Sequence, residues 1–414
     1  MKILMVCNGA YPDEIGGAHT YVYELARHLV ALGHDLTVLT RRTTPELPRE
    51  ETISGVRYIR YEYRNTKDPL RWRYRLYHGA RKAFRALSET ESFDVVHGHW
   101  PHSAAGVFEH PATDGALKVY TLHAPFFEEE KIEAAVLRAG QPLTVRGMLK
   151  RMWVPLSLLE KRRTERRALR RCSVVFVLSR FMKRRAFDYF SVPLRKLKVI
   201  SGGVDTARFF PQHEREAIRE GLGIPHEKKA LLTVRRLVPR MGLKNLVRAM
   251  AIVKQHAPGA VLSIGGTGIL YDDLHKQICD LSLSDTVRLL GFIPADDLAD
   301  HYRAADYFIM PTEYLEGFGL STVEAMACGT PALGTPVGGT AEILADVDTG
   351  LLFSGTRPQD IADGILRHLN SRAPDDLRAR VARYAHKVYS WTAVARWIEE
   401  VLLENLHLKE VSQR

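Results

Sequence analysis

Two glutamates, Glu316 and Glu324, lie eight positions apart, with the segment Gly-Phe-Gly-Leu-Ser-Thr-Val between them. The glycines predict a turn behind Glu316, and a helix is expected to begin before Glu324, about two helical turns further on. A loop that leads into a helix presents free backbone N–H groups and the positive end of the helix dipole, which suit an anionic phosphate. The two carboxylates would bind hydroxyl groups. A nucleotide sugar carries both kinds of group, whereas the spacing alone also fits a capped surface helix.

The N-terminal residues predict the kind of sheet that would position such a site. Lys2–Cys7 is an apolar run that ends at Asn8, as a buried parallel strand does where it opens into a loop. Apolar residues then recur at helical spacing over 18–32 and stop at Gly33, which predicts an amphipathic helix with a glycine after its last turn. A second strand over 35–40 completes a βαβ unit. Such units form parallel sheets that bind ligands at the C-terminal ends of the strands.

Further strand-to-loop patterns continue along the chain. Apolar runs that end at a loop occur at 119–122, 173–178, 229–234, 260–264, 287–290 and 306–310. His123 follows the first of these and would emerge at the C-terminal end of its strand, where a histidine can also be purely structural. The repeated pattern over 414 residues predicts two α/β domains, because a single core stops growing at ~250–300 residues.

The stretch from Glu316 to Glu324 resembles the E-x7-E signature of retaining glycosyltransferases of the family 4 type, also described as glycosyl transferases group 1. The segment 200–205 resembles the boundary motif I-x-N-G-V-D of that family, with Gly202 in place of the asparagine. The segment 235–242 resembles the motif G-R-L-x-x-x-K-G, in which Arg236 matches the arginine and Met241 replaces the lysine. These motifs occur in the family's order along nearly the full chain.

The resemblance implies the GT-B fold, in which two doubly wound, Rossmann-like α/β domains face each other across a cleft. On this basis we expect an N-terminal acceptor-side domain over 1–202 and a nucleotide-sugar-binding domain over 203–385. A C-terminal helix over 386–414 would then return to the first domain. Two glycines followed by a proline within 202–211 suit a hinge between the domains.

The resemblance also implies roles for individual residues. Glu316 and His123 would contact the transferred sugar, Glu324 would bind the ribose hydroxyls, and Arg236 would neutralise the donor diphosphate. Arg240 and Lys244 are the cations that could replace the lysine missing at Met241. The other expected donor contacts are Gly16, Gly17, Gly291, Phe292, Ile293, Phe318, Gly319 and Leu320. No residue is assigned to a metal ion.

The implied reaction is transfer of a sugar from a nucleoside diphosphate sugar, with UDP or GDP as the expected nucleotide, to an acceptor hydroxyl. The anomeric configuration would be retained, without a metal ion or a separate cofactor, and the donor phosphate itself is thought to assist the acceptor hydroxyl. The acceptor would be a sugar, a lipid-linked glycan or a small molecule. A disaccharide synthase or phosphorylase of the same fold would share these motifs, and only product analysis separates them.

The composition limits the expected location and partners of the protein. The chain is 45% hydrophobic and 26% charged, with no apolar run of ~18 residues and no signal-peptide cleavage pattern, so we expect a cytoplasmic protein. The four cysteines are scattered without a CxxC pattern, which favours neither disulfides nor zinc. The net charge of +11 fits nucleic acid, an anionic membrane or an anionic substrate.

Basic residues gather in two segments, 71–87 and 146–171. The first is expected to be a helix whose charges face water. The second also carries apolar residues, so it could contact the anionic inner membrane surface peripherally or pack on the sheet. Neither segment interleaves its charges with stacking aromatics in a recognised binding motif, which disfavours a nucleic-acid-binding protein.

Three further motifs bear on other functions. An NAD-dependent oxidoreductase is disfavoured because Gly266-x-Gly268 lacks the third glycine of the dinucleotide-binding pattern. The histidine pair at 97 and 99 has no nearby residues that would complete a metal site. The pair Asp346 and Asp348 precedes a turn that resembles the family's closing loop, and it is not expected to bind a metal ion.

Overall fold

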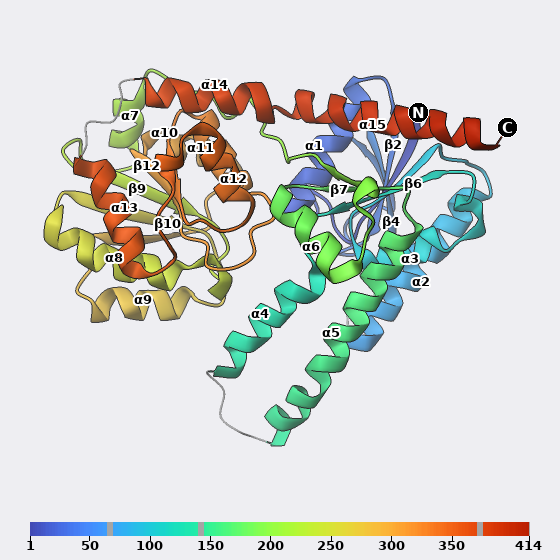
Figure 1. Cartoon of the computed structure of the whole chain (residues 1–414), viewed down its shortest axis with the longest axis horizontal. Helices are drawn as coiled ribbons and strands as arrows, with labels where there is room; N and C mark the ends of the chain where they lie inside the picture. Colours follow the sequence, from blue (N-terminus) through green and yellow to red (C-terminus); the bar gives the residue numbers. More distant parts are fainter. Residues whose placement is uncertain (64–68, 140–144, 371–375, 414) are drawn as a thin grey trace. The chain divides into compact units, whose positions relative to one another are not determined.

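The computed structural model describes residues 1–63, 69–139, 145–370 and 376–413, without the side chains of 69–70, 133–139, 145–153 and 412–413. Its contacts divide the chain into two compact units (Figure 1). Unit 1 comprises Met1–Lys131, Gln141–Gly202 and Trp391–Arg414, and unit 2 comprises Ile132–Gly140 and Gly203–Ser390.

Unit 1 is built on a sheet in which every described pair of neighbouring strands is parallel except β3 and β4. The strand order is β3-β4-β2-β1-β5-β6-β7-β8. The strands are β1 (Lys2–Val6), β2 (Asp35–Arg41), β3 (Glu50–Ile53), β4 (Val56–Tyr61), β5 (Val95–Gly98), β6 (Leu117–Leu122), β7 (Val174–Val177) and β8 (Leu197–Val199). The order reverses between β1 and β5, so their C-terminal ends form the switch point where doubly wound sheets bind ligands.

The helices of unit 1 lie in two groups around this sheet (Figure 1). In the first group α2 and α5 both contact α3, and in the second α1 contacts α15. The helices are α1 (Gly17–Ala31), α2 (Pro69–Ser88), α3 (Pro101–Phe108), α4 (Phe126–Ala139), α5 (Val145–Arg171), α6 (Arg180–Phe190) and α15 (Trp391–Gln413), with 3-10 turns at Pro111–Thr113 and Leu194–Lys196. Only the first part of α4 belongs to unit 1.

The last helix, α15, belongs to unit 1 although the chain reaches it from unit 2. It buries Trp391, Val394, Ile398 and Leu402 in the core of this unit, and Glu399 accepts a hydrogen bond from His34 at 2.7 Å. Fully burying a side chain of this size stabilises the fold by about 1.5–3 kcal/mol. The expected return of the C-terminal helix to the first domain is therefore confirmed.

Unit 2 contains a parallel sheet with the order β11-β10-β9-β12-β13. The strands are β9 (Lys229–Val234), β10 (Ala260–Gly265), β11 (Val287–Gly291), β12 (Tyr307–Met310) and β13 (Ala332–Gly334). Numbered along the chain this order is 3-2-1-4-5, and the reversal between β9 and β12 is the switch point of unit 2. Two Rossmann-like α/β domains with parallel sheets are therefore confirmed.

Helices cover both faces of the unit 2 sheet (Figure 1). One group contains α8, α9 and α13, and the other contains α10, α11 and α14. The helices are α7 (Arg215–Gly221), α8 (Leu243–His256), α9 (Tyr271–Asp280), α10 (Ala295–Ala304), α11 (Leu320–Ala327), α12 (Gly338–Val347), α13 (Pro358–Asn370) and α14 (Leu377–Tyr389), with 3-10 turns at Pro239–Met241 and Thr349–Leu351. No helix among the described residues combines the length and the apolar character that a membrane span requires.

Candidate functional site

The switch point of unit 2 brings together the loop after β9, residues 235–241, and the loop after β12, residues 311–319. Gly242 closes the first loop at φ +71°, in the left-handed region, and a Cβ at this position would clash with the carbonyl oxygen of Pro311. Arg240 joins the loops as well, because its carbonyl oxygen accepts hydrogen bonds from the backbone N–H groups of Glu313 and Tyr314. The two loops therefore form one packed structure.

Glu316 lies in the second loop, where its carboxylate meets a cation from the first. Arg235 Nη2 donates to Glu316 Oε2 at 2.9 Å, and Arg235 Nη1 donates to Thr312 Oγ1 at 3.0 Å. The side chains are 4% exposed for Arg235 and 15% for Glu316. Burial lowers the pKa of Arg235 to about 10, with Glu316 opposing the shift, so the guanidinium is charged at neutral pH.

The backbone beside Glu316 is fixed on both sides. Leu315 adopts φ +43°, an uncommon conformation for a residue with a branched side chain, and its carbonyl oxygen accepts from Arg240 Nη1 at 2.9 Å. On the other side, the carbonyl oxygen of Glu316 accepts from the N–H of Gly339 at 2.8 Å. The position of the carboxylate is thus set by the fold before any ligand binds.

The loop continues into the N-terminus of α11. Gly319 is the N-cap at φ +107°, and a Cβ there would clash with the hydroxyl of Thr340. No side chain caps this helix end, so its first N–H groups are available to an anion. Phe318 is buried and packs with its ring 5.5 Å from that of Tyr389, and Leu320 begins the helix.

Glu324 lies one turn into α11 and faces α10. Its Oε2 accepts a hydrogen bond from the hydroxyl of Tyr302 at 2.8 Å. Burial raises the pKa of the Glu324 carboxyl, and the hydrogen bond from Tyr302 opposes the shift. Glu316 and Glu324 therefore have different partners, one a buried cation and the other a neutral donor.

The expected cations of the loop after β9 have different surroundings. The side chain of Arg236 is exposed and makes no hydrogen bond or ion pair with the described residues. Arg240 is buried and holds the Leu315 carbonyl. Lys244, in the first turn of α8, pairs with Asp273 of α9 at 2.7 Å.

The expected base-pocket residues follow β11. Gly291 ends the strand and its carbonyl oxygen accepts from the N–H of Gly266 at 2.6 Å. Phe292 is 58% exposed, whereas Ile293 is buried against Gly265. Of these two side chains only Phe292 offers its apolar surface to a ligand.

Unit 1 places Gly16 and Gly17 at the N-terminus of α1, beside the switch point between β1 and β5. Gly16 is the N-cap, and its carbonyl oxygen accepts from the N–H of Thr20. The side chain of Glu14, in the same loop, pairs with Arg41 at 2.5 Å and lies 3.9 Å from His19 Nε2.

His123 emerges after β6, as the sequence predicts, and lies in a cluster of aromatic rings. His99 Nδ1 is 3.3 Å from His123 Nε2, and the ring of Tyr21 meets that of His123 edge-on at 4.9 Å. Burial lowers the pKa of His123 to about 3, and His19 contributes to this shift. The imidazole is therefore neutral at physiological pH and can donate or accept one hydrogen bond to a sugar hydroxyl.

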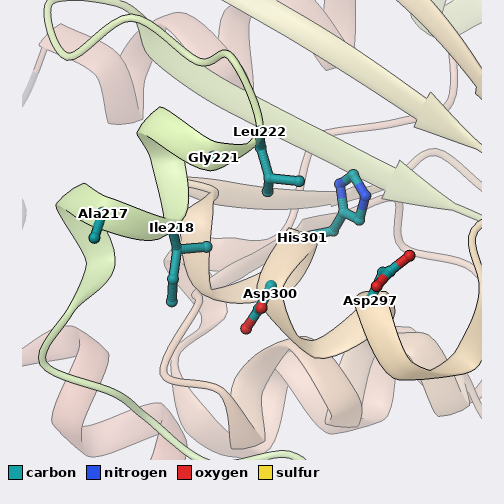
Figure 2. A pocket seen from close by; sticks show the side chains of 7 residues that line it. All are labelled: Ala217, Ile218, Gly221, Leu222, Asp297, Asp300 and His301. Atoms are coloured by element: carbon teal, nitrogen blue, oxygen red, sulfur yellow. The ribbon is translucent and has the colours of Figure 1, made fainter.

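A surface depression between α7 and α10 of unit 2 is separate from these residues (Figure 2). It is lined by Ala217, Ile218, Gly221, Leu222, Asp297, Asp300 and His301. None of the expected donor contacts lines it, and Asp300 already pairs with Arg303 at 2.7 Å. Among the described residues, no group of three or more His, Cys, Asp or Glu side chains is arranged to hold a metal ion.

Comparison with known proteins identifies the family. Residues 15–208 match the family described as Glycosyltransferase Family 4, and residues 214–388 match the one described as Glycosyl transferases group 1. A D-inositol 3-phosphate glycosyltransferase of Kineococcus radiotolerans is 30% identical, with 94% of this chain and 90% of the relative covered. The chain belongs to the family 4 type of glycosyltransferases. Membership of this family favours a glycosyltransferase over the oxidoreductase and nucleic-acid-binding alternatives.

Other relatives agree with this glycosyltransferase over nearly its whole length. An uncharacterized glycosyltransferase of Methanocaldococcus jannaschii is 29% identical and covers 96% of both chains. The structure of sucrose-phosphate synthase from Thermosynechococcus elongatus has a TM-score of 0.79 at 22% identity, covering 98% of this chain and 99% of the other. Anabaena HepE in complex with UDP and glucose has a TM-score of 0.72 at 20% identity, covering 98% and 100%. These structures confirm the GT-B fold.

Sequence reasoning missed one residue of the candidate site, Arg235. The family motif implies a role for Arg236, whereas in the structure it is the guanidinium of Arg235 that contacts Glu316. A signal was present in the sequence, because Arg235 and Arg236 both directly follow the strand β9, which ends at Val234. Either arginine could therefore have been expected at the C-terminal end of this strand.

Proposed function

We propose that this glycosyltransferase transfers a sugar from a nucleoside diphosphate sugar to an acceptor hydroxyl, with retention of the anomeric configuration and without a metal ion. The observation that carries this proposal is the loop from Glu316 to Gly319. It sets a carboxylate beside a buried guanidinium and leads into the uncapped N-terminus of α11 at the switch point of the sheet. The carboxylate suits hydroxyl groups, and the guanidinium and the N-terminus of α11 suit phosphate oxygens.

In the proposed reaction the bond between the anomeric carbon and the diphosphate breaks, and a bond to the acceptor oxygen forms on the same face. The departing diphosphate takes the acceptor's proton, as the family resemblance implies, so no protein base is assigned. Positive charge on arginine side chains and the N–H groups at the start of α11 stabilise the leaving group. Glu316 and His123 contact the transferred sugar, and Glu324 binds the ribose hydroxyls.

The acceptor is proposed from the names of the relatives. Several relatives that match over at least 85% of their own length are D-inositol 3-phosphate glycosyltransferases. A phosphorylated cyclitol is therefore the first acceptor to test, followed by sugars and lipid-linked glycans. The net charge of +11 suits an anionic acceptor of this kind.

Peripheral contact with an anionic membrane is a second part of the proposal. Within α5, Leu156 and Leu159 are 59% and 43% exposed, and the exposed Arg162 and Arg163 follow them. Apolar and basic side chains on one helix suit a surface of anionic lipid. Co-sedimentation with vesicles that contain phosphatidylserine, compared with phosphatidylcholine vesicles, tests this contact; equal binding to both would contradict it.

The donor is tested by thermal unfolding with UDP, GDP, ADP and TDP, each with and without EDTA, because a ligand that binds only the folded state raises its stability. We expect a shift with one nucleotide that EDTA leaves unchanged. The matching nucleotide sugar is then incubated with inositol 3-phosphate, and the anomeric proton of the product is compared with that of the donor by NMR. An inverted product would contradict retention, and a shift that EDTA removes would contradict metal independence.

A further inference from the structure

The segment from the end of β9 to the first turn of α8 carries four basic residues, Arg235, Arg236, Arg240 and Lys244. Two of them are engaged away from Glu316. Arg240 donates to the Leu315 carbonyl, and Lys244 pairs with Asp273 at the surface. Arg236 is exposed to solvent. Only the guanidinium of Arg235 is buried and in contact with the Glu316 carboxylate.

The main chain of Arg235 is held by the end of β10. Its N–H donates to the carbonyl oxygen of Gly265 at 3.0 Å, and the N–H of Leu237 donates to Thr267 at 2.8 Å. These bonds fix the direction in which the side chain leaves the strand. The guanidinium is therefore preorganised at the switch point, so little conformational entropy is lost when it binds an anion.

The guanidinium has more donors than its present partners use. Nη1 donates to Thr312 and Nη2 to Glu316, while Nε is buried without a hydrogen-bond partner among the described residues. A guanidinium carries five N–H donors in a planar fork that matches the oxygens of a phosphate. Glu316 and Thr312 do not occupy all of these donors, and an unsatisfied N–H donor on a buried cation is energetically unfavourable.

We propose that Arg235 is the cation that binds the donor diphosphate in this chain, and that donor binding exchanges its partner. In the free protein Glu316 neutralises Arg235. When the donor binds, phosphate oxygens take the place of the Glu316 carboxylate at Arg235, and the carboxylate is released to the hydroxyls of the sugar. Met241, which is buried and uncharged, cannot supply this charge. The inference rests on the proposed function, since it requires a nucleoside diphosphate sugar as donor.

The experiment compares dissociation constants for a nucleoside diphosphate and the monophosphate of the same base, measured by calorimetry. Arg235→Met is expected to weaken diphosphate binding about 10- to 100-fold, because a charge-assisted contact is lost, and to weaken monophosphate binding less. Arg235→Lys keeps the charge and should retain most of the affinity. Glu316→Gln should leave diphosphate binding unchanged or tighter, because it removes a competitor for Arg235. Arg248→Gln, at an exposed position on α8, is the control and should change neither constant.

A purely structural ion pair gives a different pattern, in which Arg235→Met and Glu316→Gln weaken diphosphate binding alike. That result, or an unchanged preference for diphosphate in Arg235→Met, would overturn the inference. If Arg235→Met does not fold, the double variant Arg235→Met/Glu316→Gln removes both charges together and takes its place. We expect the same weakening of diphosphate binding for this double variant. If the unaltered protein binds none of UDP, GDP, ADP and TDP, the proposed function itself fails, and the inference fails with it.

Discussion

Glu316 holds a carboxylate where two loops of unit 2 meet, and both its side chain and its backbone are fixed by neighbours. Arg235 and Thr312 contact its side chain, and Gly339 binds its carbonyl oxygen. The fixed backbone matters for transfer, because it holds the carboxylate near the sugar after the donor has displaced it from Arg235. The carboxylate should therefore contribute more to turnover than to folding.

Glu316→Gln is expected to reduce kcat at least about 100-fold, which corresponds to ~2.7 kcal/mol in the activation barrier. The amide keeps the size of the side chain, so the melting temperature should stay within a few degrees of the unaltered protein. Initial rates with a saturating donor measure the effect. The matched control is Glu313→Gln, three positions earlier in the same loop, which should keep the rate within about twofold. Equal rates for the two variants would remove Glu316 from the chemistry.

At the scale of elements, the turn from Pro239 to Gly242 joins β9 to α8 and sets the separation of the two site loops. Gly242 takes φ +71° directly against the Pro311 carbonyl, and the N–H of Leu246 donates to its carbonyl oxygen at 3.0 Å. A side chain here would push the loop after β12 away from the loop after β9. The alignment of Arg235 with Glu316 depends on this close approach.

Gly242→Ala is expected to destabilise the protein by about 1–3 kcal/mol, from the left-handed backbone and the clash together. Nucleotide binding should weaken as well, because the displaced loop carries Glu316. Gly259→Ala is the control, since a Cβ there meets nothing within 4 Å and the backbone is not left-handed. That variant should fall within about 0.5 kcal/mol of the unaltered protein in urea unfolding. Equal stability of the two variants would contradict the close packing of the loops.

The central strands and the helices beside them could be predicted because each carries its own local signal. β1, α1 and β9 show apolar runs or helical periodicity that end at an asparagine, a glycine and an arginine respectively. The hairpin of β3 and β4 was missed, since β3 is mostly exposed and has no apolar run. The prediction that the charged side chains of α2 face solvent was wrong for Arg73. This side chain is buried and pairs with Glu160 of α5 at 2.8 Å. Such a contact depends on tertiary packing, which periodicity does not encode.

The sequence also predicted part of the candidate site. Glu316, Gly319 and the start of α11 follow from a motif whose residues are adjacent in sequence. The partners of Arg240 and Lys244 did not follow, because Leu315 and Asp273 lie in other segments and their approach is set by the fold. The role of Glu324 stays a prediction, although its buried position opposite Tyr302 suits a hydrogen-bonding carboxylate.

On the scale of the whole molecule, each unit has its own sheet and core. The two units differ in their tryptophans. Trp72, Trp100, Trp153, Trp391 and Trp397 are the five tryptophans of the chain, and all belong to segments of unit 1. Tryptophan fluorescence therefore reports the unfolding of unit 1. Binding of a nucleotide to the loops of unit 2 can be followed separately by calorimetry.

Three buried histidines make unit 1 sensitive to acid. His97, His99 and His123 lie at the C-terminal ends of β5 and β6, and burial lowers the pKa of each, to about 3 for His97 and His123. Above pH 6.5 these imidazoles are neutral in both the folded and the unfolded chain, so they do not affect stability. Below it the unfolded chain binds protons that the folded chain excludes, so stability falls as the pH falls. Glu165, whose pKa burial raises well above its usual value, offsets part of this loss.

The variant His97→Gln isolates one of these protons. His97 lies 2.8 Å from Thr121 Oγ1, a contact that the glutamine amide can replace, but the variant has no imidazole to protonate. Between pH 5.5 and 4 the free energy of unfolding of the unaltered protein should therefore fall faster than that of His97→Gln, by ~1.4 kcal/mol per pH unit, and near pH 6.5 by about half as much. Urea unfolding followed by tryptophan fluorescence at several pH values measures both slopes. Parallel slopes would mean that the folded chain protonates His97 as readily as the unfolded chain does, which its complete burial beside His99 and His123 makes unfavourable.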